Sequence, residues 1–139
     1  MKKRTILWGI VLGTYYLLTV FISTRIRYGF PIKNLSLFVF SDGWINYSTI
    51  DLLKDIVVNI ITYMPIGYMC VKLMHHNVNI STKYFISVSL GCALSVIKEV
   101  VQLLTSSGCC DVNDIFFNVV GTVLGVILCV LLITVRQKK

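Results

Sequence analysis

Charged residues are scarce in this chain of 139 residues, and the acidic ones are scarcest. Asp and Glu number 6 against 13 Lys and Arg, and the four types make up 14% of the sequence, where soluble domains have about 25%. There is no internal repeat and no low-complexity segment. With 56% hydrophobic residues and a mean hydropathy of +0.82, this composition excludes an ordinary soluble domain.

Sequence motifs of common enzymes and cofactor sites are also missing. There is no Ser-His-Asp constellation, P-loop or G-x-G-x-x-G. The five cysteines form no C-x-x-C and are not paired with His at zinc spacing. Cys70, Cys92 and Cys129 lie in apolar runs, where they are typical small core residues. We expect no disulfide framework, no cofactor and no metal centre.

A net charge of +7 raises the question of nucleic acid as a partner. The basic residues lie between the apolar runs. They form no basic amphipathic helix and do not alternate with aromatic residues as in many nucleic-acid-binding proteins. We therefore predict that the chain binds no nucleic acid and that its partner is the lipid bilayer.

The apolar runs predict an all-α, multi-pass bundle of four transmembrane helices within a single domain, residues 1–139. A helix needs about 20 apolar residues to cross a bilayer. The first run follows three basic residues, as a signal peptide would, but no A-x-A cleavage site comes after it, so we interpret it as a retained helix. The predicted helices are about 6–23, 49–74, 84–105 and 114–135, and an outer loop spans 25–50.

Charge asymmetry predicts the orientation of the bundle. With four spans, both termini share one side with the turn near residues 75–83. Eight basic residues and no acidic one belong to that side, whereas all six acidic residues belong to the other. Because loops rich in Lys and Arg stay in the cytoplasm, we predict cytoplasmic termini in the cell membrane and acidic groups at the outer face.

Polar side chains recur at helical spacing near the predicted outer face. Glu99 and Gln102 are three residues apart and share a face. In the second helix, Pro65 and Gly67 predict a kink or loosened turn. Two further stripes are Asp51, Asp55, Asn59 and Tyr63, and Asp114, Asn118, Gly121 and Gly125. The lower part of the second stripe is the G-x-x-x-G pattern of closely packed membrane helices, and we expect three helices to enclose one polar pocket.

Three sequence blocks resemble the VanZ-like family of membrane proteins. E-V-V-Q, C-D-V-N-D and N-V-V-G-T-V-L-G within residues 99–125 are similar to the family's E-x-x-Q, D-x-x-D and N-x-x-G-x-x-x-G. N-I-I-T-Y-M-P-I-G at 59–67 is similar to its second block. Asn34-Leu35, with the aromatic residues at 38 and 40, matches its N-L-x-P-F element without the proline. The resemblance covers roughly residues 30–128.

This resemblance implies a small integral membrane protein of a Gram-positive bacterium. The family's namesake is associated with low-level resistance to the glycopeptide teicoplanin, and no reaction is assigned to the family. By position, its polar residues fall on Asn59, Glu99, Gln102, Asp111, Asp114 and Asn118, and its backbone-shaping residues fall on Pro65, Gly67, Gly121 and Gly125.

One departure from the family pattern concerns a basic residue. Many members have an Arg in the turn before D-x-x-D, where this chain has Ser106-Ser107-Gly108-Cys109-Cys110. Lys98 adjoins Glu99, but on a helix it is expected to point about 100° away. If the family's Arg binds a phosphate, this protein binds it differently or not at all.

Each candidate residue also has a structural interpretation. Glu99 could act as a general acid or base or carry a proton, or it could link helices by bonding to Asn118 or Asn59. Asp111 and Asp114 could ligate a cation together with Asp51 or Asp55. The alternative is that Asp111 is a turn residue and that Asn113 or Asp114 caps the last helix.

Three functional hypotheses follow from the sequence. In the first, the protein acts at the outer face of the membrane, where its pocket engages a cell-envelope lipid, a lipid-linked precursor or a lipophilic glycopeptide. The second is an intramembrane enzyme acting on a lipid head group, with Glu99 and Asp111/Asp114 as acid/base groups or metal ligands. The third is a structural or accessory membrane subunit. The sequence leaves the ligand, the oligomeric state and the role of Cys109-Cys110 open.

Overall fold

The structure, a computed structural model, describes residues 2–26, 35–36, 49–74, 77–105 and 110–137. Its elements are α1 (Lys2–Ile26), β1 (Leu35–Ser36), α2 (Thr49–Leu73), α3 (Ile80–Leu104), β2 (Cys110–Asp111) and α4 (Val112–Gln137). All four helices are long and apolar enough to cross a membrane, which confirms the predicted all-α bundle of four spans. Most of the predicted outer loop, 25–50, lies outside the described residues.

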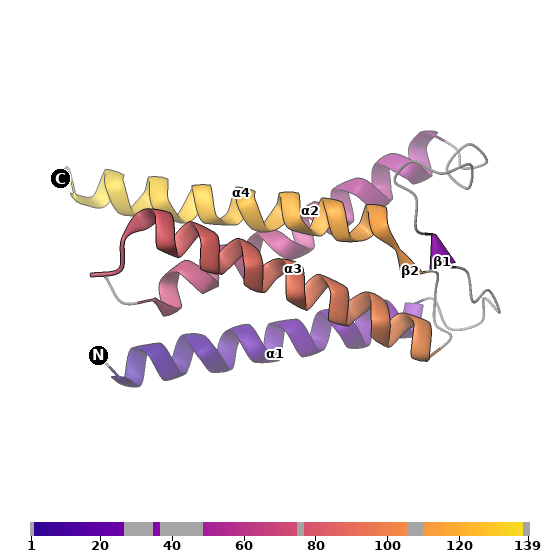
Figure 1. Ribbon diagram of the computed structural model, residues 1–139, viewed down its shortest axis with the longest axis horizontal. Coiled ribbons are helices and arrows are strands. Elements are labelled where there is room, and N and C mark those ends of the chain that lie inside the picture. Colours follow the sequence, from indigo (N-terminus) through magenta and orange to yellow (C-terminus); the bar gives the residue numbers. More distant parts are fainter. Residues whose placement is uncertain (1, 27–34, 37–48, 75–76, 106–109, 138–139) are drawn as a thin grey trace.

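The helices form one elongated bundle whose two ends differ (Figure 1). Both termini lie at one end, together with the connection from α2 to α3. At the opposite end, β1 and β2 pair in parallel, with Leu35 beside Cys110 and Ser36 beside Asp111. The termini therefore share one side of the membrane, as an even number of spans requires.

The closest helix pair is α2 with α4, and glycines make this approach possible. A Cβ atom on Gly121 would collide with the backbone carbonyl of Ile60, and one on Gly125 with that of Met64. Conversely, a Cβ on Gly67 would meet the backbone of Thr122. Small residues let backbones come this close in membranes. α2 runs without interruption through Pro65, whose ring does not end the helix.

α1 lies at the side of the bundle and is anchored by two tyrosines. The Tyr15 hydroxyl donates to the backbone carbonyl of Thr62 in α2 at 2.9 Å, and the Tyr16 hydroxyl donates to that of Leu94 in α3 at 2.7 Å. Leu12 packs into the core, and most other large apolar side chains of α1 are exposed on the protein surface. That surface suits contact with lipid chains, which are as apolar as the side chains.

Two helices begin earlier than the apolar runs indicate, because a polar side chain caps each start. α3 begins at Ile80, where the predicted start was residue 84; the Asn79 side chain accepts a hydrogen bond from the Ser81 amide at 3.2 Å. α4 begins at Val112, directly after Asp111. Such caps satisfy amides that have no partner inside the helix.

The buried face of α3 is polar along its whole length, and its exposed faces are apolar. Lipid surrounds the bundle, so polar groups are favoured inside it, where they can bond one another. The first and last of these residues are 19 positions apart, or about 28 Å along a helix, which is close to the thickness of a bilayer core. The buried residues are Lys83, Ser87, Gly91, Ser95, Lys98, Glu99 and Gln102.

Candidate functional site

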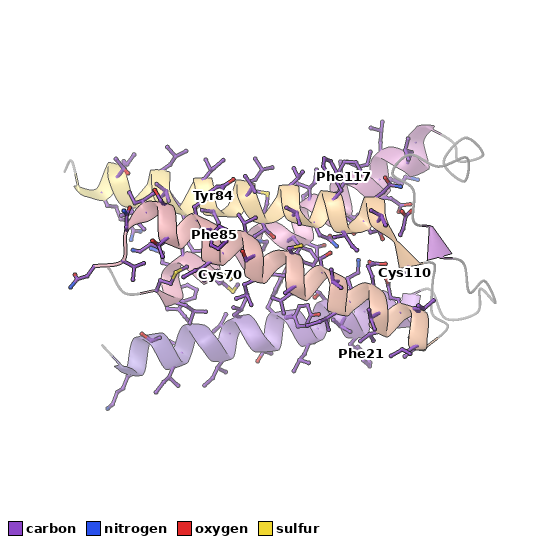
Figure 2. The ribbon with its side chains drawn as sticks, in the orientation of Figure 1. Phe21, Cys70, Tyr84, Phe85, Cys110 and Phe117 are labelled. Atoms are coloured by element: carbon purple, nitrogen blue, oxygen red, sulfur yellow. The ribbon has the colours of Figure 1, made fainter. Side chains whose placement is uncertain are left out.

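The most concentrated polar chemistry lies where α3 ends and α4 begins, at the end of the bundle opposite the termini (Figure 1). Figure 2 shows Cys110 at this end and Tyr84 and Phe85 of α3 toward the other. We call Lys98, Glu99 and Asp114 the charged cluster. Their exposed fractions are 6%, 0% and 7%, so three ionisable side chains lie inside the bundle.

Glu99 is held from three directions. The Lys98 ammonium lies 3.0 Å from its Oε1, and the backbone N–H of Asp111 donates to its Oε2 at 3.2 Å. The surrounding groups require the Gln102 amide to turn its nitrogen toward the carboxylate, and Nε2 then donates to both oxygens at 3.1 Å. Glu99 and Gln102 thus meet as neighbours on one helix face.

Lys98 lies between two carboxylates on different helices. Its Nζ is also 3.9 Å from Oδ2 of Asp114 in α4. The expectation that Lys98 points away from Glu99 is wrong. Its four-carbon stem has enough rotatable bonds to bend back across one position of the helix, and the second carboxylate draws the ammonium inward.

Asn59 connects the charged cluster to α2. Its Nδ2 donates to Oδ1 of Asp114 at 2.7 Å. Because Asp114 also faces Lys98, the cluster links α2, α3 and α4 at one level of the bundle. Glu99 is bonded to neither Asn59 nor Asn118, the two partners proposed for an interhelical link.

Asp111 caps α4. Its Oδ1 accepts from the backbone N–H of Asn113 at 2.8 Å and from the Asn113 side chain at 3.0 Å. The expectation that Asn113 or Asp114 caps this helix is wrong, because α4 starts two residues earlier than the apolar run. The carboxylate at the helix N-terminus is also favoured by the helix dipole. Asp111 therefore positions the start of α4, and its amide contacts Glu99.

A second polar layer lies below the charged cluster, toward the middle of the membrane. Nδ2 of Asn118 donates to Oγ of Ser95 at 2.8 Å, and the Thr122 hydroxyl donates to the Asn118 carbonyl at 2.9 Å. Tyr63 in α2 is fully buried. Within the described part of the chain, the Tyr63 hydroxyl and Oδ1 of Asn118 have no hydrogen-bond partner.

The structure thus brings five of the six predicted polar residues into one network, and Asn118 lies in the layer below. Two contributors were not predicted: Lys98 inside the cluster and Ser95 as the partner of Asn118. Asn113, expected as a possible cap, instead donates to Asp111. A signal for the α3 positions was present in the sequence. Small or polar residues recur there every four positions, at 83, 87, 91, 95 and 99.

The proposed cation site has no support from the described side chains. Among them, no group of three or more His, Cys, Asp and Glu residues lies close enough together to hold a metal ion. Oδ1 of Asp111 serves the α4 cap and Asp114 bonds Asn59, while Asp55 is half-buried. The side chain of Asp51, His75-His76 and Cys109 lie outside the described residues.

Fold and site together define a multi-pass membrane bundle with a buried, ion-paired cluster at one end. The model of the VanZ/LLP1 family matches residues 6–133. The chain therefore belongs to the VanZ/LLP1 family. No curated protein and no solved structure matches it.

Proposed function

We propose that this protein acts at the outer face of the cytoplasmic membrane, where the end of the bundle that contains the charged cluster engages a cell-envelope lipid, a lipid-linked precursor or a lipophilic glycopeptide. By this action it would lower the susceptibility of a Gram-positive host to teicoplanin. The observation that carries the proposal is the burial of Lys98, Glu99 and Asp114 at one end of the bundle. Burying an ionisable group within a membrane bundle is costly, about 2.5–3.5 kcal/mol at the centre of a helix by insertion scales and less toward its ends, so ionisable groups buried in membrane helices generally serve a function.

The assignment of this end to the outer face rests on charge. The described acidic residues belong to the end with the cluster, whereas Lys72 and Arg136 lie in last turns of helices at the end with the termini. The positive-inside rule places the basic end in the cytoplasm. The cluster then lies near the outer leaflet, where envelope precursors and glycopeptides meet.

The charged cluster offers a specific mode of recognition. Lys98 is an ammonium donor held between two carboxylates, and Gln102 and Asn59 are amide donors beside them. Such a set can exchange internal bonds for bonds to phosphate oxygens, hydroxyls or amides of a head group. Ligand binding at this end would therefore rearrange the contacts that join α2, α3 and α4.

A second candidate is a structural or accessory subunit. It is favoured by one observation: the charged side chains of the cluster already have partners on neighbouring elements. In this view the polar layers only hold the helices together, and polar interhelical bonds of this kind are common in membrane proteins.

Antibiotic susceptibility, measured together with stability, separates these two candidates. The wild type, Glu99→Gln and the control Thr134→Ala are expressed at matched membrane levels in a Gram-positive host, and teicoplanin and vancomycin susceptibility are measured. Thr134 is exposed and bonds only the Val130 carbonyl of its own helix. Thermal unfolding of each purified protein is measured in the same detergent.

If the proposed function holds, we expect the wild type and Thr134→Ala to protect the host against teicoplanin. Glu99→Gln should give no protection although its unfolding temperature is unchanged. If protection and unfolding temperature fall together, the structural candidate is favoured. Equal protection by all three proteins assigns Glu99 to packing alone, and no protection by any of them refutes the resistance role.

A further inference from the structure

The end of the bundle that holds the termini has a basic character of its own. Each of its helix ends carries a basic residue: Lys3 in α1, Lys72 in the last turn of α2, Lys83 in α3 and Arg136 in the last turn of α4. The acidic residues that the structure describes belong to the other end. An anionic partner would therefore meet no repulsion here from a described Asp or Glu side chain.

Lys83 is the most unusual of these residues. It is 9% exposed, and its ammonium forms no hydrogen bond or ion pair with any other residue that the structure describes. Its Nζ is not one of the fully buried polar atoms that lack a partner, so a mostly buried stem carries an ammonium that still reaches the surface of the protein. Because side chains of a helix point toward its N-terminus, the Lys83 stem is directed toward the membrane surface, where lipid head groups lie.

Lys72 is held at the same end by aromatic rings. Its Nζ lies 5.5 Å from the ring centroid of Tyr68, a cation–π distance. Tyr68 in turn packs edge-on against Trp8 of α1, with ring centroids 6.4 Å apart. Trp and Tyr are enriched at the membrane–water interface, so this contact holds Lys72 at the depth of lipid phosphates.

The two lysines come from consecutive helices and flank the short connection between them. Lys72 lies in the last turn of α2, and Lys83 is the fourth residue of α3, a helix that packs against both α2 and α4. The start of α3 adds further positive potential, because no acidic residue lies in its first turn and free amides at a helix N-terminus favour anions.

We propose that this end of the bundle binds the phosphate group of an anionic phospholipid, held by Lys83 and Lys72 at the interface of α2, α3 and α4. The phosphate supplies the Lys83 ammonium with a counter-charge that none of the described residues provides. A net negative lipid is selected because two lysines repel the ammonium of a zwitterionic head group. This site is independent of the proposed function and lies at the opposite end of the molecule.

Lipid titration of the purified full-length protein tests the proposal. Short-chain phosphatidylglycerol and short-chain phosphatidylcholine are added separately to protein in non-ionic detergent, inorganic phosphate is added alone and together with phosphatidylglycerol, and bound species are counted by native mass spectrometry. The variant Lys72→Gln/Lys83→Gln removes the two proposed contacts. The control Lys3→Gln/Arg136→Gln removes the same charge from the same end.

We expect phosphatidylglycerol to bind the wild type and the control alike, and to bind the Lys72/Lys83 variant about tenfold more weakly, given the usual attraction of each basic residue to anionic lipid. If both double variants lose phosphatidylglycerol binding equally, binding depends only on the total positive charge of this end, and the proposed site at Lys72 and Lys83 is overturned. Equal binding of phosphatidylcholine, or full competition by inorganic phosphate, would overturn the choice of an anionic phospholipid.

Folding of the variants is controlled separately. Lys83→Arg keeps the charge and is expected to retain binding. Lys72→Gln alone changes a half-buried residue and is expected to lose part of the binding even if Lys83→Gln fails to fold. Full binding by Lys72→Gln together with loss by Lys83→Arg would contradict a charge-based site.

Discussion

At the scale of single residues, Lys98 decides the electrostatics of the charged cluster. Its ammonium is 3.0 Å from Glu99 and 3.9 Å from Asp114, so one cation serves two carboxylates that would otherwise repel each other. Removing one member of a buried ion pair lowers the stability of the fold more than replacing both members by apolar residues, because the remaining charge stays buried without a partner.

Replacement of Lys98 by Met tests this role. We expect Lys98→Met to lower the free energy of unfolding by about 3–5 kcal/mol, because two carboxylates lose their shared cation. The measurement is denaturant unfolding in mixed micelles. Lys3→Met, on an exposed position of α1, serves as the control and should change the value by less than about 0.5 kcal/mol. A similar small change for Lys98→Met would show that the pair contributes nothing.

At the scale of the helix, the close approach of α2 and α4 depends on glycines, which have no side chain to keep the two backbones apart. Gly125 faces the backbone of Met64, and Gly121 faces that of Ile60. A backbone carbonyl cannot rotate out of the way as a flexible side chain can. An added methyl group therefore has to push the two helices apart, which also moves Asn59 away from Asp114.

A matched pair of glycine substitutions measures this effect. We expect Gly125→Ala to destabilise the bundle by about 1–3 kcal/mol, the usual range for overpacking. Gly13 in α1 has nothing within 4 Å of the position of an added Cβ. Gly13→Ala should thus be neutral or stabilising by up to about 1 kcal/mol, because Ala favours a helix more than Gly does. Thermal unfolding in detergent gives both values, and equal effects would contradict close packing at Gly125.

The start of α4 gives a second prediction at this scale. Asp111→Ala should cost about 1 kcal/mol through loss of the cap, whereas Asp111→Asn, which still accepts a hydrogen bond from the Asn113 amide, should retain most of the stability. The same unfolding measurement applies to both variants. If Asn is as harmful as Ala, the charge of Asp111 matters and its bond to the Asn113 amide does not.

At the scale of the whole molecule, the shared location of the two termini restricts the topology. Both lie at one end of the bundle (Figure 1), so reporters fused to either terminus must be on the same side of the membrane. The excess of Lys and Arg at this end favours the cytoplasm.

Fusion reporters check the orientation. A fluorescent protein that matures only in the cytoplasm should be bright at either terminus, and alkaline phosphatase, which is active only outside it, should be inactive at both. Opposite behaviour at both termini would reverse the proposed orientation and place the charged cluster at the inner face. Different results at the two termini would contradict four spans.

The class of protein and most of its helices follow from the amino-acid sequence alone. Apolar runs of membrane length and the paucity of charge are properties of composition and spacing, and they act independently of any contact. The same holds for the stripe from Asp114 to Gly125, since helical periodicity alone places its members on one face. The boundaries were less accurate, because Asn79 and Asp111 begin α3 and α4 before the apolar runs do.

The partners within the polar network depend instead on how the helices pack against one another. Asn59 is 55 positions from Asp114, the residue that it bonds, and periodicity says nothing about which helix faces which. The prediction for Lys98 fails because the position of a residue on a helix determines the direction of its Cβ, whereas a long flexible stem can carry the charge elsewhere. The physical reason is general: spacing fixes the face of a residue, whereas its partner depends on how close the helices approach, and here glycines in α2 and α4 set that distance.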